Sequence, residues 1–390
     1  AMGVPRGYIW NGAVSGGGME PKRIVFLSAK SGGGHDGAAR ALSALIEARY
    51  PGRFQFDILD IYNAKADRAL PLLAQIRHHS DVIWQLFLWL TNHRFFVSLA
   101  RWFMQPYMLR QIRRQLPDQP IAVLVAVHFN PAQWVNALAD SLTGRPRTVI
   151  VATDYDPHWS WIGQADAIVV ASEGGKLKAQ QVGYLPAQLL QLPVLPNEQA
   201  VNAQGGTAIV RESATRKRVL MVSGQDGSNQ KKILALLRGI AALPVATQMT
   251  LDVYCGKNAA LKQAIEQLAP ALGTLELRAH GFVPGLHLKI AAADLMLMRA
   301  SPQILSECIS AGVPVLAFDW SVHEQYQAVL INRENLGVAS KQENVILQHL
   351  QRMISIKQEY QRYEAGVQSL ARGFDAEQLL AHVLPGVAGV

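Results

Sequence analysis

The sequence twice shows the same order of features: a short apolar strand, a glycine turn and then a helix. The first copy runs from Arg23 to Leu27 into three consecutive glycines, and apolar residues then recur at helical spacing as far as Ile46. The second copy runs from Arg218 to Val222 into a turn that contains two glycines. Glycine lets a ligand approach the main chain, and the helix start behind it presents N–H groups that attract anions. Both turns are therefore candidate phosphate-binding sites.

His35 follows the glycines of the first turn and is expected at the lip of a cleft. A neutral imidazole in that place can accept a proton near physiological pH. The alternative is an ordinary turn with a surface histidine, because the turn contains neither the dinucleotide fingerprint nor the Lys–Ser/Thr pair of the P-loop.

Strand-like and helical patterns alternate along the whole chain. This rhythm predicts an α/β protein with two doubly wound parallel sheets, and 390 residues suffice for two domains. A helix is expected around 131–142, and residues from about 340 to 382 are expected to be helical. The remaining expected strands are 54–60, 121–127, 148–152, 167–172, 191–194, 248–254, 276–280, 294–298 and 314–318.

The expected domain boundaries follow from composition. Residues 1–21 are glycine-rich and aperiodic, and are expected to be a disordered or artificial leader. The polar stretch from Asn197 to Arg218 is the expected linker. An N-terminal domain over 22–200 and a C-terminal domain over 201–365 are expected, with a helix in 366–390 that packs back on the N-terminal domain.

The net charge of +8 favours an anionic partner, such as nucleotide phosphates or an anionic membrane surface. No basic run is dense enough to indicate nucleic acid. The only cysteines, Cys255 and Cys308, give neither a disulfide framework nor a metal cluster, which favours the cytoplasm. No metal and no cofactor are expected, and the Asp-x-Asp pattern at Asp154 and Asp156 is not interpreted as a metal site.

Residues 83–116 mix large aromatics with arginines and contain no acidic residue. Charge interrupts the segment too often for it to span a bilayer, but an aromatic face with arginines beside it is typical of a helix in a membrane interface. The alternative is a helical pair packed on the sheet. The residues expected at the membrane are Trp84, Phe87, Trp89, Phe95, Trp102, Arg110, Arg113 and Arg114.

Ligand sites in parallel sheets lie where the strands end, so the residues after strands are functional candidates. In the first half these are His128, with Phe129 and Asn130, and the segment 153–158.

An ordered set of motifs covers nearly all of residues 22–385 and resembles the monogalactosyldiacylglycerol synthase and processive diacylglycerol glucosyltransferase group, which is similar to glycosyltransferase family 28. More distantly, the chain is similar to the N-acetylglucosaminyltransferase of peptidoglycan precursor synthesis. The motifs are Ser31–His35, Asp57–Asp60, Thr153–Asp154 with His158 and Trp159, Val170–Glu173, Val253–Asn258, His280–Val283, Ala292–Leu295 and Ser306–Pro314.

The resemblance implies a metal-independent, inverting enzyme of the GT-B fold, with two Rossmann-like domains that face each other across a cleft. It implies a UDP-sugar donor in the C-terminal half and a diacylglycerol-like lipid or other hydrophobic acceptor, with the enzyme peripheral on the inner face of the cell membrane. His35 would be the general base, and Asp154 would orient this histidine or the acceptor, or have a structural or helix-capping role. The implied acceptor side also contains Gly33, Gly34, His128 and His158.

On the donor side, the resemblance implies that Glu307 accepts hydrogen bonds from the ribose hydroxyls, as a carboxylate is suited to do. Phe282 and Val283 would border the base. The residues implied at the diphosphate are Ser223, Gly224, Gly227 and Ser228.

The chain departs from the family pattern in two segments of the second half. Where the family has Lys-Pro-Gly-Gly, this chain has Arg299 to Pro302, so Arg299 and Ser301 are expected to compensate at the diphosphate. Glu324 and Gln325 replace parts of a Pro-Gly-Gln-Glu loop and are expected at the donor sugar. The alternatives to hexose transfer from a UDP-sugar to a lipid are a different donor with a soluble acceptor, or a non-catalytic nucleotide-sugar or lipid-binding protein.

Overall fold

The computed structural model describes residues 21–29, 33–61, 90, 93–195, 216–223, 230–273, 275–321 and 324–386. The chain divides into two compact units, of which the first consists of Ala1–Glu198 with Asp375–Val390 and the second of Gln199–Phe374. The expected linker 197–218 and leader 1–21 lie almost wholly outside the described residues.

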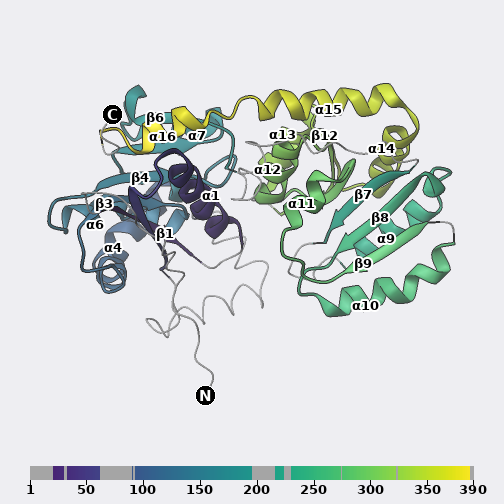
Figure 1. The fold of residues 1–390 in the computed structure, drawn as a ribbon, viewed down its shortest axis with the longest axis horizontal. Coiled ribbons are helices and arrows are strands. Elements are labelled where there is room, and N and C mark those ends of the chain that lie inside the picture. The colour runs from purple at the N-terminus through teal and green to yellow at the C-terminus, as the bar shows by residue number, and fades with distance from the viewer. Residues whose placement is uncertain are drawn as a thin grey trace, which may run out of the picture. The chain divides into compact units, whose positions relative to one another are not determined.

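A six-stranded parallel sheet forms the centre of the first unit, in the order β2-β1-β3-β4-β5-β6 (Figure 1). Its strands are β1 Lys22–Ser28, β2 Phe54–Asp60, β3 Ile121–Ala126, β4 Arg147–Val151, β5 Ala167–Val170 and β6 Leu189–Gln191. The side chains from Ile24 to Leu27 in β1 are fully buried, as expected of an apolar strand covered on both faces. The chain extends the sheet to one side of β1 with β2 and to the other with β3, so the topological switch point lies between β1 and β3.

Helices and short 3-10 turns connect these strands. They are α1 Gly33–Arg49, α4 Arg94–Arg113, α5 Phe129–Ala132, α6 Val135–Asp140, η1 Trp159–Trp161, α7 Glu173–Gln181, η2 Pro186–Gln188 and the C-terminal α16 Ala376–Val383. The single helix expected over 131–142 is wrong, because the chain turns at Gln133 and Trp134 between α5 and α6. The strand expected over 191–194 lies earlier, since Pro193 has no N–H for the ladder with β5.

The second unit contains a second six-stranded parallel sheet, in the order β12-β11-β10-β7-β8-β9 (Figure 1). Its strands are β7 Lys217–Val222, β8 Met249–Tyr254, β9 Glu276–His280, β10 Leu295–Arg299, β11 Val315–Asp319 and β12 Gly337–Ala339. Its helices are α9 Gln230–Ala241, α10 Ala259–Leu268, α11 Leu286–Ala291, α12 Pro302–Ala311, α13 Gln325–Arg333, α14 Glu343–Ser355 and α15 Lys357–Ala371, with η3 Ala246–Gln248 and η4 Ala269–Leu272. Here the switch point lies between β7 and β10.

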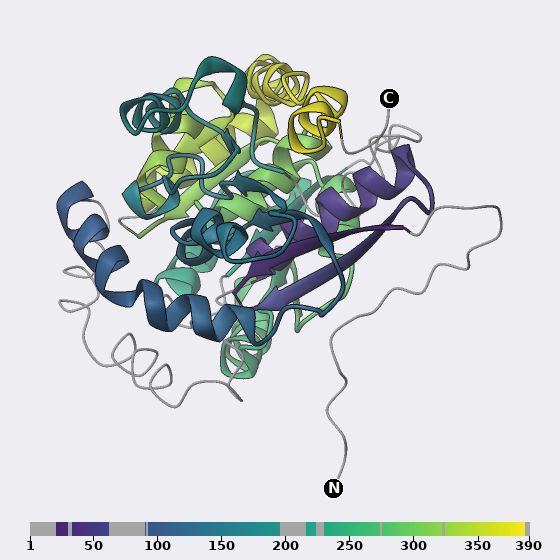
Figure 2. The ribbon, with the colours of Figure 1, turned by 90° about the vertical axis from the view of Figure 1, so that its left-hand side faces the viewer.

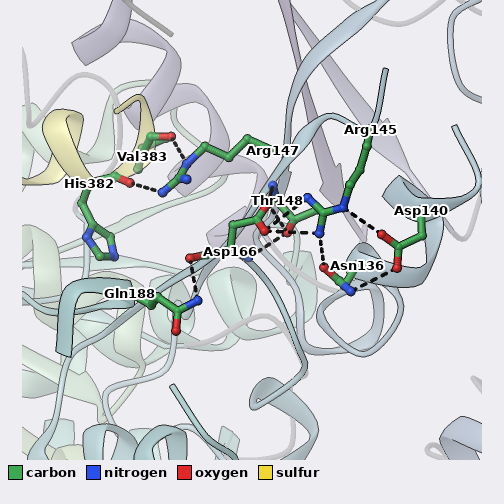
Figure 3. A network of polar contacts seen from close by, with 9 residues as sticks. All are labelled: Asn136, Asp140, Arg145, Arg147, Thr148, Asp166, Gln188, His382 and Val383. Carbon is green, nitrogen blue, oxygen red and sulfur yellow. Dashed lines mark hydrogen bonds and ion pairs between the residues drawn. The ribbon is translucent and has the colours of Figure 1, made fainter. Parts of the chain in front are cut away.

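The last helix, α16, belongs to the first unit although it follows the whole of the second in the sequence. Arg147 at the start of β4 donates to the backbone carbonyls of His382 (3.0 Å) and Val383 (3.2 Å), as Figure 3 shows. Beside Arg147, the carboxylate of Asp166 accepts from the backbone and hydroxyl of Thr148 and from Arg145. The chain end is thus tied to the same strand that leads into the candidate site of this unit.

Candidate functional site

His35 lies at the switch point of the first unit. It is in the first turn of α1, the helix that follows β1. Its neighbours come from the segments after β3 and β4, the next two strands across the sheet. The ring atom Nδ1 lies 3.0 Å from the carbonyl oxygen of Val127 and 2.9 Å from Oγ1 of Thr153. A carbonyl oxygen only accepts, so Nδ1 carries the proton and, in the neutral ring, Nε2 has the free electron pair.

Burial lowers the pKa of His35 below its usual value of 6.5, and the Asp154 carboxylate opposes this shift. The ring is therefore mainly neutral at pH 7. Asp154 is fixed in turn, because its Oδ2 accepts from Nε1 of Trp161 at 2.6 Å. Asp154 thus acts on the charge of His35 through space. The geometry fits a general base whose proton-accepting atom is Nε2.

His128 packs edge-on against His35, with their ring centroids 4.5 Å apart, and is buried. Its Nδ1 accepts from the backbone N–H of Asn130, which caps α5. Burial and then the neighbouring His35 and His158 lower its pKa well below 6.5. His128 thus has a structural role as the N-cap of α5, and it also belongs to a cluster of histidines around His35. The His158 ring packs against Phe129 in the same cluster.

Gly33 and Gly34 are the first two residues of α1. The two aspartates of the Asp-x-Asp pattern, Asp154 and Asp156, contact different partners. Asp156 pairs with Lys178 at 3.3 Å, whereas Asp154 binds Trp161. Within the described part of the chain, no group of three or more His, Cys, Asp or Glu side chains is arranged to hold a metal ion.

In the second unit, Ser223 directly follows β7, Arg299 ends β10 and Ser301 comes two residues later, so all three are at the switch point. Ser223 is buried, and its hydroxyl donates to the carbonyl of Tyr254 at 3.3 Å. Ser301 is the residue before α12, whose first residue is Pro302. The predicted diphosphate residues Gly224, Gly227 and Ser228 lie outside the described residues.

The Arg299 guanidinium contacts acidic side chains of its own unit. Its Nη2 lies 3.1 Å from Oε2 of Glu324, and that oxygen also accepts from the backbone and hydroxyl of Ser321. Asp319, at the end of β11, pairs with Lys232 at 3.2 Å. The sequence assigned Arg299 and Glu324 separately to a diphosphate and a sugar, whereas the structure joins them as one ion pair. The amide oxygen of Gln325 accepts from Trp320.

Glu307 is buried on α12, with 5% of its surface exposed, so it is not an ordinary surface glutamate. Its Oε1 accepts from the side-chain amide of Gln303 at 3.2 Å. A carboxylate is seldom buried without a functional or structural reason, because desolvation of its charge is expensive. Phe282, after β9, is 69% exposed, which is unusual for so large an apolar side chain, and Val283 is half-buried.

Several residues of both sites escaped the sequence analysis. Val127 acts through its backbone carbonyl and Trp161 through its indole N–H, and neither role has a sequence signal. Asp319 is the last residue of a strand, and that position could have identified it. His280, the last residue of β9, forms a further pair with Asp252 in β8, with Nε2 and Oδ1 2.6 Å apart.

Helix α4 is only partly packed. Met108 and Ile112 are buried, whereas the side chains of Phe95 and Trp102 are 72% and 74% exposed. The part of α4 around Phe95 and Trp102 therefore has the expected exposed aromatic face. The part around Met108 and Ile112 instead packs on the unit. Arg110, Arg113 and Arg114 are at the surface near its end, and Trp84, Phe87 and Trp89 lie outside the described residues. Among the described helices, none combines the length and apolar character needed to cross a membrane.

Comparison with known proteins gives distant relatives, and no family model matches the chain. A processive diacylglycerol β-glucosyltransferase of Bacillus pumilus is 25% identical over 223 residues, which are 54% of this chain and 57% of that protein. A probable chloroplastic monogalactosyldiacylglycerol synthase of Nicotiana tabacum is 21% identical over 77% of this chain and 58% of its own length. The chain thus matches less than two thirds of these relatives.

Among solved structures, MurG of Acinetobacter baumannii superposes with a TM-score of 0.60 at 15% identity, over 93% of this chain and 99% of MurG. At that identity the likeness concerns the fold alone. Together with the two parallel sheets, it confirms the predicted GT-B fold.

Proposed function

We propose that this chain, a distant relative of the diacylglycerol glucosyltransferases and monogalactosyldiacylglycerol synthases, is an inverting, metal-independent glycosyltransferase that moves a hexose from a UDP-sugar to a lipid acceptor at a membrane surface. A fold of this kind hosts many activities, so the residues of the site must support the reaction. The observation that carries the proposal is the neutral His35, whose Nδ1 is turned to the Val127 carbonyl and whose Nε2 is left to accept a proton.

In the proposed reaction, Nε2 of His35 takes the proton of an acceptor hydroxyl as its oxygen attacks the anomeric carbon of the donor. The bond from that carbon to the diphosphate breaks, and UDP leaves with the electron pair. Asp154 stabilises the imidazolium that forms, because its carboxylate raises the pKa of His35. A positioned base of this kind contributes about 10²–10⁴-fold to the rate.

The second unit is proposed to bind the donor. Glu307 is assigned to the ribose hydroxyls, and its burial on α12 supports a fixed carboxylate acceptor. The turn after β7, with Ser223, and the start of α12, with Ser301, are assigned to the diphosphate because both lie at the switch point. Arg299 and Glu324 form an ion pair at the same edge and are proposed to bind the diphosphate and the sugar by exchanging partners.

The exposed aromatic face of α4 supports a lipid acceptor. Phe95, Trp102 and Phe103 are each more than 70% exposed, beside arginines and without acidic neighbours in the helix. Such a surface favours the interface of an anionic membrane, where rings enter the headgroup region and arginines meet lipid phosphates. The enzyme is therefore proposed to act as a peripheral protein on the inner face of the cell membrane.

The test is transfer from UDP-glucose and UDP-galactose to diacylglycerol in anionic vesicles, with the glycolipid product measured by mass spectrometry. We expect His35→Gln to lower kcat about 100-fold or more with UDP binding unchanged, because only the base is lost. Glu307→Gln is expected to weaken UDP binding about tenfold, because a charged acceptor is lost. Full turnover in His35→Gln would remove the assignment of the base.

One observation favours the non-catalytic alternative. Pro302 is the first residue of α12 and has no N–H to offer a phosphate where the family pattern has glycines. A protein that binds UDP-sugars by calorimetry and transfers no sugar to any lipid or soluble acceptor would support this alternative. Transfer to a soluble acceptor without vesicles would instead support the rival enzyme.

A further inference from the structure

A cavity of about 120 Å³ lies in the first unit between α4 and the segment around η1. Its walls include Arg94, Ser98 and Arg101 of α4 on one side, and Gln133, Trp159 and Gln164 on the other. One water needs roughly 10–15 Å³ by such a measure, so the cavity admits a group of several atoms. It is distinct from the His35 cluster, none of whose members His35, His128 and Asp154 lines it.

Among the described residues, two guanidinium groups line this cavity and no carboxylate does, so the described lining leaves their charge uncompensated. In the described part of the chain, neither Arg94 nor Arg101 forms an ion pair, although Arg94 lies over the Trp159 ring at 5.8 Å. The sequence has no Asp or Glu between Asp81 and Asp118. Two arginines with hydroxyl and amide donors beside them match an oxyanion such as a phosphate.

The spacing on α4 indicates what carries this phosphate. Arg94, Ser98 and Arg101 are four and three residues apart, so they share the helix face that lines the cavity. The next stripe, one residue further on, is Phe95, Leu99 and Trp102, whose side chains are 72%, 51% and 74% exposed. A polar stripe that lines the cavity thus runs beside an apolar stripe at the surface. Figure 2 shows the course of α4 as the blue helix at the lower left.

We propose that the cavity between α4 and η1 binds the phosphate of an anionic membrane lipid, whose acyl chains lie along the exposed stripe of α4. The arginines supply charge-assisted hydrogen bonds to the phosphate, and Ser98, Gln133 and Gln164 supply uncharged donors to the rest of the headgroup. The site has a link to the chemistry, because Trp159 lines it while Trp161 of the same 3-10 turn binds Asp154. The proposal does not depend on sugar transfer, and its test measures binding alone.

The test is calorimetry on the full chain with dihexanoyl-phosphatidylglycerol below its micelle concentration. We expect the Arg94→Gln/Arg101→Gln variant to lose roughly tenfold or more in affinity, since two charged partners are lost. Arg40→Gln/Arg53→Gln is the matched control, because these two arginines are exposed in the same unit and lie outside the cavity. The control should keep the wild-type affinity, and thermal unfolding should show that both variants fold.

Two further probes identify the source of the phosphate. Dihexanoyl-phosphatidylcholine should bind at least tenfold more weakly, because its choline cation meets two arginines. Glycerol 3-phosphate should also bind more weakly, because it lacks the acyl chains. Equal affinity for glycerol 3-phosphate would assign the cavity to a soluble phosphate and overturn the lipid assignment. No binding of any probe, or equal losses in the two double variants, would overturn the site itself.

Discussion

Burial lowers the pKa of His35 and the Asp154 carboxylate raises it, and the balance of the two decides the pH range in which the proposed enzyme is active. The base must be neutral, so kcat/KM should be constant around neutral pH and fall only below the ordinary histidine range, where the imidazole of the free enzyme takes up a proton. Asp154→Asn removes the opposing charge, which lowers the pKa further and should move the acid limb to lower pH. A pH–rate profile of both proteins is the measurement, and an acid limb that stays in place in Asp154→Asn would contradict this coupling.

At the scale of the element, α4 presents an apolar surface that contributes little to the folded unit. Trp102 and Phe103 are 74% and 77% exposed, so serine at both positions should leave the unfolding midpoint unchanged. Burying one such side chain in a lipid interface contributes about 1.5–3 kcal/mol to binding. Loss of both side chains should therefore weaken vesicle binding about tenfold or more. Leu185→Ser, which removes an exposed leucine elsewhere in the unit, is the control. Cosedimentation with anionic vesicles is the measurement, and equal binding by all three proteins would contradict the role of α4.

Gly163 shows how closely the elements around the site approach one another. A Cβ at this position would lie 1.8 Å from the backbone oxygen of Ala132 in α5, so the segment after η1 touches the helix that follows His128. Gly163→Ala must move backbone and should lower stability by about 1–3 kcal/mol. Gly281→Ala is the control, since its nearest neighbour is 3.8 Å away. Urea unfolding followed by far-UV circular dichroism, which reports on both units, measures the effect, and a normal midpoint in Gly163→Ala would contradict the close packing.

At the scale of the whole molecule, the sequence predicted what depends on local pattern. The bounds of β2 and β9 were predicted correctly because each is a short segment of strand-forming residues. The GT-B fold followed from the alternation of strands and helices and from the family resemblance. Contacts between distant segments were missed. No local signal pairs Arg299 with Glu324 or turns the His35 ring to the Val127 carbonyl, because those contacts depend on which strands become neighbours.

The return of the chain end to the first unit makes the stability of that unit depend on residues beyond the second. Leu379, Leu380 and Val383 of α16 are buried, and Arg147 donates to two carbonyls at the end of this helix. Because hydrogen bonds of charged groups contribute about 1.5–3 kcal/mol, Arg147→Gln should lower the stability of the first unit by that amount. Arg49 also reaches α16, through an exposed ion pair with Glu377, and such pairs contribute about 1 kcal/mol or less.

Arg49→Gln is therefore the matched control for Arg147→Gln, because both variants remove one contact of an arginine with the same helix. Tryptophan fluorescence reports mainly on the first unit, since seven of the eight tryptophans precede residue 199. The urea midpoint should fall clearly in Arg147→Gln and hardly at all in Arg49→Gln. Removal of 375–390 should lower it further, because three apolar side chains lose their burial as well. A truncated chain with the wild-type midpoint would mean that α16 does not stabilise the first unit.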